Sequence, residues 1–209
     1  MTNVHRVGQW SAMLSFIFAL AYSVPQIFSE LKWIPHPQDL FWLFAPSLLL
    51  APAFMVTMIC LHYGANEDEK IWTAIGVAFA ILYCADVTLV YFSQLSVVLP
   101  RLIRSEINED YVLAFRAKTF LMAIDCLGYF FMSFSTFFAA FAFIQSDKWL
   151  FRSLLFNGLL MPILVLAFFF PVLYYVGAIW MITFPLAMIQ AWRLFRKDHL
   201  LHFHLNIEL

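Results

Sequence analysis

The sequence predicts an all-α integral membrane protein that forms one domain, a single bundle of about six transmembrane helices. Charged residues make up 12% of the chain and hydrophobic residues 64%, whereas ordinary soluble domains carry about 25% charged residues. The mean hydropathy is +0.84, and charge-free apolar stretches long enough to cross a bilayer recur along the chain. The lipid bilayer is therefore the expected surrounding of most of the surface.

The spans follow from the apolar stretches and the polar segments between them. A polar, proline-rich segment separates the first two stretches, and an acidic run before Lys70 separates the second from the third. The region 153–192 has no charge and is too long for one span, so we divide it at Phe170–Pro171, because proline disfavours helix at the residue before it. The expected spans are 9–28, 40–62, 71–92, 119–144, 149–169 and 172–192.

Tryptophans and basic residues indicate where the spans end and how they are oriented. Aromatic residues gather at membrane interfaces, and six tryptophans fall at or near the expected span ends, namely Trp10, Trp33, Trp42, Trp72, Trp149 and Trp192. With six spans, more Lys and Arg lie on the side of the N-terminus than on the opposite side. This distribution predicts cytoplasmic termini, and we expect residence in the plasma (inner) membrane.

One sizeable polar segment, residues 101–118, joins the third and fourth spans. It mixes charged residues with Leu, Ile, Val and Phe, a composition that is typical of an amphipathic interfacial loop or helix. A regulatory or partner-binding loop is the alternative for this segment.

Asp86 and Asp125 lie inside apolar stretches and are the most informative residues of the chain. An ionisable residue at bilayer depth is costly, usually faces a protein interior or a wet cavity, and often marks an ion or ligand site. We therefore expect both aspartates to line a polar centre of the bundle.

The depth of the two aspartates depends on where the third span ends. If it ends near Phe92, each aspartate lies six residues from the same membrane surface, which is about 9 Å. Consecutive antiparallel spans often pack together, so the two acids would share one site. Helical spacing puts Tyr83 on the face of Asp86 and Tyr129 on the face of Asp125, where each hydroxyl can donate to a carboxyl group. Such a pair would bind a proton or a cation.

A structural role for these groups is the alternative interpretation. One acid would then be protonated and bonded to its tyrosine, or paired with Arg152 of the fifth span. Asn157 in the same span is of the kind that joins helices by hydrogen bonds. A lipid-modifying enzyme would need a polar cluster near one interface, and Asp125, Arg152 and Asn157 are the residues from which it would be built.

The sequence names neither a reaction nor a cofactor. It lacks a metalloprotease motif and a Gly-rich phosphate loop, and its net charge of −1 gives no basis for nucleic-acid binding. We assign no metal ligands and no catalytic residues, which favours a protein that is not an enzyme. The first hypothesis is a small transporter or channel-like protein for an ion, proton or small solute. The second is a non-catalytic binding or accessory subunit of a larger membrane complex. The expected partners are a second copy of the chain, as a homo-oligomer, or another membrane protein.

Overall fold

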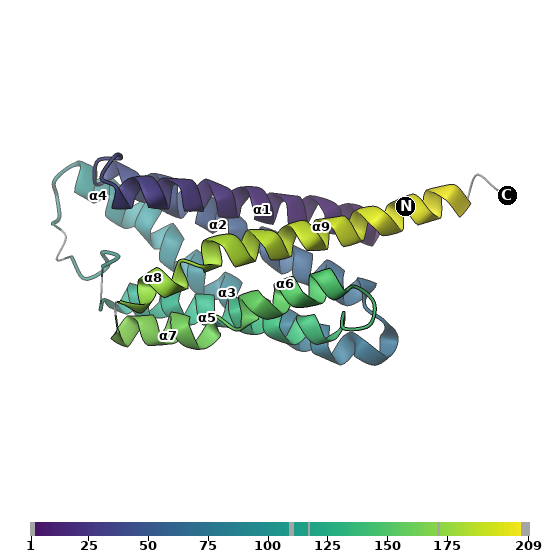
Figure 1. Cartoon of the computed structure of the whole chain (residues 1–209). Coiled ribbons are helices and arrows are strands. Elements are labelled where there is room, and N and C mark those ends of the chain that lie inside the picture. Colours follow the sequence, from purple (N-terminus) through teal and green to yellow (C-terminus); the bar gives the residue numbers. More distant parts are fainter. Residues whose placement is uncertain (1–2, 109–110, 117, 171, 206–209) are drawn as a thin grey trace.

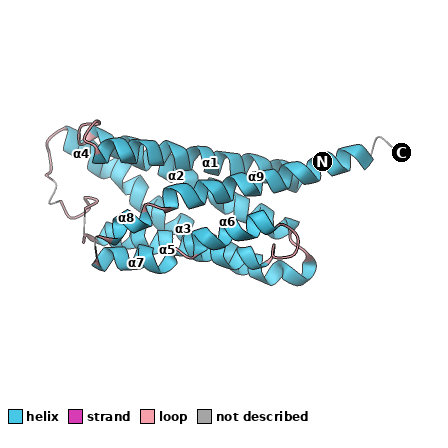
Figure 2. Ribbon diagram, viewed as in Figure 1, coloured by secondary structure: helices cyan, strands magenta, loops and turns pink. Residues whose placement is uncertain are grey.

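The computed structural model describes residues 3–108, 111–116, 118–170 and 172–205. Within these ranges every regular element is a helix, which confirms the all-α class (Figures 1 and 2). Six segments are long and apolar enough to cross a membrane, as the sequence predicts. They are Asn3–Glu30, Gln38–Gly64, Glu67–Ile103, Phe120–Phe141, Lys148–Phe169 and Tyr175–Arg196. The chain is therefore a helical integral membrane protein.

The first two spans form an antiparallel hairpin of α1 (Asn3–Glu30) and α2 (Gln38–Gly64). The buried face of α1 carries only small residues, which let neighbouring backbones approach closely in a membrane. They are Gly8, Ser11, Ala12, Ser15, Ala19 and Ser23. The hydroxyls of Ser15 and Thr57 lie 3.5 Å apart across the hairpin.

The third span begins with the 3-10 turn η1 (Glu67–Glu69) and continues as α3 (Lys70–Ser93). Two short helices extend it, the π-helix η2 (Gln94–Val98) and α4 (Leu99–Ile103). Regular α-helix thus ends one residue beyond Phe92, but the helical path continues. A π-helical turn inside a helix is rare and frequently lies at a functional site.

The polar segment before the fourth span is a loop rather than a helix. Its described residues, 104–108, 111–116 and 118–119, contain turns and bends only. The fully buried side chain of Gln94 holds it, since its amide nitrogen donates to the carbonyl of Leu113 at 2.7 Å and its amide oxygen accepts from the N–H of Phe115 at 3.2 Å. The loop is therefore anchored to the π-helical turn of the third span.

The fourth span, α5 (Phe120–Phe141), begins where the Thr119 side chain accepts a hydrogen bond from the N–H of Met122, one of the otherwise unpaired donors of a helix start. It packs along α3. Close approach is possible because Gly76 accepts a 2.6 Å hydrogen bond from Ser135, and because a Cβ on Gly128 would lie 2.8 Å from Val87. α5 occupies the middle of the lower layer in Figure 1.

The fifth span is a broken helix made of α6 (Lys148–Gly158) and α7 (Met161–Phe169). α6 begins at Asp147, whose carboxylate accepts hydrogen bonds of 3.0 Å from the N–H groups of Trp149 and Leu150. The break follows Gly158, and a proline occupies the first turn of α7, the helical position where it is best tolerated.

The sixth span is formed by the end of α8 (Leu173–Gly177) and the first part of α9 (Trp180–Leu205). α7 ends at Phe169; the turn predicted from the sequence falls at Phe170–Pro171, and Pro171 lies outside the described residues. α9 runs antiparallel to α1, since Tyr22 packs on Trp180 while His5 packs on Phe195.

Both termini therefore lie at the same end of the bundle, as Figure 1 shows. We call this the terminal end. The opposite end, which holds the segment 104–119, is called the loop end.

Candidate functional site

Asp125 is a buried carboxyl group near the loop end of the bundle. It lies five residues after the first residue of α5, which is about 8 Å along the helix axis. Its side chain is 8% exposed, and its Oδ1 atom has no hydrogen-bond partner among the described residues. Buried polar atoms are almost always paired, so an unpaired one indicates a place that a proton, a water molecule or a ligand completes.

Tyrosine hydroxyls surround this carboxyl group. The Tyr91 hydroxyl of α3 donates a hydrogen bond to the Tyr129 hydroxyl at 3.1 Å, and it also lies within hydrogen-bonding reach of Asp125. Because its hydroxyl hydrogen rotates, Tyr91 can donate either to Tyr129 or to the carboxylate, so these three groups form a hydroxyl chain with Tyr91 at its centre. Tyr22 of α1 and Tyr83 of α3 also lie close enough to interact with the charge of Asp125.

Ring packing fixes the positions of these tyrosines. The centroids of Tyr83 and Tyr129 lie 6.0 Å apart, and Trp180 of α9 packs on Tyr129 at 5.1 Å and on Tyr22 at 5.9 Å. All three contacts are edge-to-face, the geometry that aromatic pairs prefer. The Trp180 indole N–H donates to the sulfur of Met132 at 3.1 Å. Helices α1, α3, α5 and α9 thus converge on one aromatic cage around Asp125.

Tyr83 supplies a second unpaired atom of the cage. Its side chain is fully buried, and its hydroxyl has no hydrogen-bond partner among the described residues. The sequence suggested that Tyr83 would serve Asp86 on its own helix. Instead the hydroxyl interacts with the charge of Asp125 on α5, so the two unpaired atoms belong to the same region.

Asp86 occupies a different environment. It is half-buried, one of its carboxylate oxygens has no partner, and a Cβ on Gly128 would lie 3.4 Å from its own Cβ. Gly128 is three residues further along α5 than Asp125, so Asp86 lies about 4.5 Å deeper from the loop end. Neither a hydrogen bond nor an electrostatic contact joins the two aspartates within the described part of the chain. They are neighbours on packed helices, not a carboxyl pair.

Arg152 and Asn157 lie away from Asp125. The guanidinium of Arg152 lies over the ring of Trp149 at 5.8 Å, at the terminal end of the bundle. Asn157 is fully buried and joins three helices, because it donates to Thr136 and accepts from Thr183, both at 3.0 Å. The structure therefore does not bring Asp125, Arg152 and Asn157 into one polar cluster.

A small pocket of about 210 Å³ opens at the loop end above the cage. Its lining residues are His36, Leu40, Gln94, Val98, Leu102, Ala114, Phe115 and Arg116. Phe44 lies beside this pocket, since its ring packs on the lining residue Phe115 at 5.4 Å and on Tyr91 at 5.5 Å. Phe44 thus contacts both the wall of the pocket and the hydroxyl chain.

Several residues of the cage were missed by the sequence analysis. Tyr22, Tyr91 and Trp180 reach Asp125 from other helices, and no local spacing relates them to it. The sequence does offer one signal for Trp180, because it is the tryptophan that does not fall at an expected span end. In the structure Trp180 is buried, with 3% of its surface exposed.

The described residues contain no group of three or more His, Cys, Asp or Glu side chains that could hold a metal ion. Comparison with family models, with curated proteins and with solved structures finds no match to this chain. Fold and site together define a class, a six-span membrane protein with a carboxyl group buried in a tyrosine cage. Its function has to be inferred from that site.

Proposed function

We propose that this protein is a small membrane transporter or channel-like protein, and that the ion it handles at Asp125 is a proton. The observation that carries the proposal is the buried carboxyl group with an unpaired oxygen, surrounded by the hydroxyls of Tyr22, Tyr83, Tyr91 and Tyr129. Ionisable residues inside membrane spans mark ion pathways and proton relays more often than they serve packing alone.

The chemistry of the cage favours a proton over a larger cation. Asp125 contributes one carboxylate, and its neighbours are hydroxyls, which can pass a proton by rotating and exchanging hydrogen bonds. Cations such as Ca²⁺ take six or more oxygen ligands, usually including several carboxylates. One carboxyl group beside phenolic hydroxyls supports proton binding better than it supports such a coordination shell.

The loop-end pocket supports access to the site from one side of the membrane. Water in this pocket would reach Phe115, which lines it, and movement of the Phe44 ring, which packs on Phe115 and on Tyr91, would connect the pocket with Tyr91. From Tyr91 the hydroxyl chain leads to Asp125 and Tyr129. We propose that Phe44 is the gate on the loop side.

Proton flux in liposomes tests this proposal. Purified protein is reconstituted with a trapped pH-sensitive dye, a pH gradient is imposed with the membrane potential clamped, and the rate of internal pH change is measured. Wild type should exceed empty liposomes. Asp125→Asn, which keeps the shape but cannot ionise, should reduce the rate to that of empty liposomes.

Asp86→Asn is the matched control, because Asp86 lies on the adjoining helix but outside the tyrosine cage. It should retain most of the flux. A wild-type rate equal to that of empty liposomes, or a flux that survives Asp125→Asn together with Asp86→Asn, would remove the proposal. Gel-filtration profiles of all variants establish that they remain folded.

The second candidate is an accessory subunit, and the environment of Asp86 favours it. The surface around Asp86 is apolar and open, with Leu82, Leu89 and Leu127 exposed by 45%, 60% and 39%. The unpaired oxygen of Asp86 is itself enclosed, but the residue is only half-buried, so a second copy or another membrane helix would pack over the apolar surface beside it. Purification of a stable monomer that conducts protons alone would count against this candidate.

For orientation we propose cytoplasmic termini in the plasma (inner) membrane, from the distribution of Lys and Arg.

A further inference from the structure

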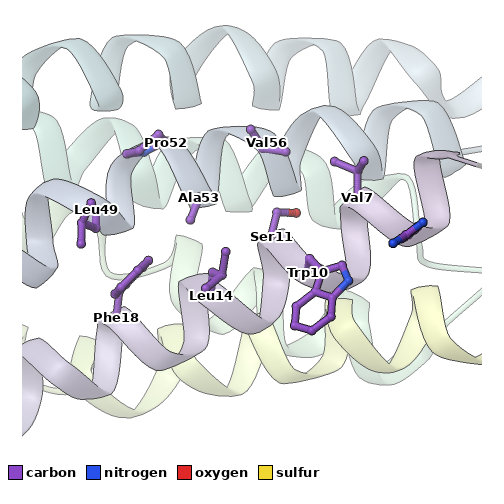
Figure 3. A pocket seen from close by; sticks show the side chains of 10 residues that line it. Val7, Trp10, Ser11, Leu14, Phe18, Leu49, Pro52, Ala53 and Val56 are labelled. Carbon is purple, nitrogen blue, oxygen red and sulfur yellow. The ribbon is translucent and has the colours of Figure 1, made fainter.

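An elongated groove of about 470 Å³ runs along the outer surface of the hairpin of α1 and α2 and ends at Phe18, one helical turn before Tyr22 of the cage. Figure 3 shows its walls, with Trp10, Leu14 and Phe18 on one helix and Leu49 and Val56 on the other. The complete lining is Arg6, Val7, Trp10, Ser11, Leu14, Phe18, Leu49, Pro52, Ala53 and Val56.

The groove arises from the spacing and size of these residues. On both helices they recur at intervals of three and four, so each helix contributes one face. The space between the faces stays open because the residues at its floor are short, namely Ser11 on α1 and Ala53 with the adjoining Pro52 on α2. Its rim faces outward, since Val7, Trp10 and Leu14 are 47%, 63% and 41% exposed.

The length of the groove matches one leaflet of a bilayer. Its α1 wall extends from Val7 to Phe18, a distance of about 16 Å along the helix. One leaflet contributes half of a hydrocarbon core that is about 30 Å thick. A single extended acyl chain that lies parallel to the helices would therefore fill the groove from the interface to the bilayer centre.

The charge at the terminal end of the groove complements a phosphate group. Arg6 is the sole charged residue of the lining, it is exposed, and it forms no ion pair with the described residues. Arg193 and Arg196 lie at the same end, on the part of α9 where Phe195 packs against Gly8 and His5. Guanidinium groups bind phosphate oxygens with good geometry. Trp10 lies one helical turn after Arg6 in the groove lining, and tryptophan is enriched where helices meet lipid headgroups.

We propose that this groove is a binding site for one anionic phospholipid, with an acyl chain between α1 and α2 and the phosphate on Arg6. The site is independent of the function proposed for Asp125. It would fix the hairpin in a defined lipid environment at the terminal end.

Native mass spectrometry on protein released from mixed micelles tests the site. The probes are phosphatidylglycerol and diacylglycerol with identical acyl chains, which differ in the phosphate-containing headgroup. Wild type should retain one phosphatidylglycerol and prefer it over diacylglycerol. Arg6→Gln should lower this preference about tenfold, since hydrogen bonds to charged groups are the strong ones.

Ala53→Phe fills the floor of the groove and should abolish retention of both lipids. Ala78→Phe is its matched control, because Ala78 is exposed on the outer face of α3, and it should retain the lipid like wild type. Equal retention by Ala53→Phe and wild type, or an equal preference in Arg6→Gln, would overturn the proposal.

Photo-crosslinking provides a measurement that does not depend on variants. Phosphatidylglycerol with a diazirine in its acyl chain should label peptides that contain residues 7–18 and 49–56. Labelling distributed evenly over all lipid-facing helices would show an ordinary lipid shell and would also overturn the proposal.

Discussion

A carboxyl group within a bilayer needs a polar surrounding, and the two aspartates of this protein meet that need differently. Asp125 is enclosed by tyrosines from three helices, whereas Asp86 has an apolar, open surface beside it. The contrast argues that Asp125 is the residue at which a proton is held within one protein chain. Asp86 lacks such a surrounding, so its charge has to be removed by protonation or compensated by a polar group of a second protein.

Asn157 is a fully buried side chain whose amide nitrogen and oxygen are both hydrogen-bonded, and it gives a prediction about stability. Asn157→Ala removes the hydrogen bonds to Thr136 and Thr183, which connect α6 with α5 and α9. We expect a loss of about 1–2 kcal/mol in the free energy of unfolding, since an interhelical hydrogen bond in a membrane contributes about 0.6 kcal/mol on average and the partners are left unpaired.

Thermal unfolding in detergent measures this loss. The control is Ser153→Ala on the same helix, because its hydroxyl bonds only to the carbonyl of Leu150 one turn earlier. An equal effect of the two substitutions would show that Asn157 does not join the helices.

At the scale of the elements, glycines decide how closely the helices pack. A Cβ on Gly158 would lie 2.6 Å from the Cα of Phe137, in the backbone of α5, whereas a Cβ on Gly64 would meet nothing within 4 Å. Gly158→Ala should therefore destabilise the protein by about 1–3 kcal/mol, the range for overpacked sites. Gly64→Ala should change stability by less than about 0.5 kcal/mol. Denaturation midpoints in one detergent compare them, and equal midpoints would contradict the close contact of α5 and α6.

For the helices, the sequence predicts some features and not others. Charged residues and tryptophans predict where the spans end, and Pro171 predicts a turn after Phe169. The break between α6 and α7 was not expected, because residues 153–169 carry no charge and their apolar character is the same on both sides of it. Gly158 and Pro162 were the available signals, but both are common inside membrane helices.

The cage around Asp125 could be predicted only in part, for a related reason. Spacing along one helix places Tyr129 beside Asp125 and Tyr83 beside Asp86, yet in the structure the Tyr83 hydroxyl lies near enough to Asp125 to interact with its charge. Which face of α3 meets α5 depends on the contact of Gly128 with Val87. That contact is tertiary, and no periodicity within one span encodes it.

At the scale of the whole molecule, six spans place both termini on one side of the membrane. In a background without native cysteines, Asn3→Cys and Asp68→Cys should react with an impermeant thiol reagent from the same side, and Glu106→Cys from the other. All three positions are exposed. Reaction of Asn3→Cys and Glu106→Cys from the same side would contradict the six-span arrangement.

Infrared difference spectroscopy of the reconstituted protein tests the central claim most directly, because it observes the protonated carboxyl group itself through its C=O stretch. As the pH is stepped, wild type should show a band for a buried carboxyl group that gains and loses its proton. We predict that this band is absent in Asp125→Asn and present in Asp86→Asn. A band that persists unchanged in Asp125→Asn would contradict the assignment of Asp125 as the proton-binding residue.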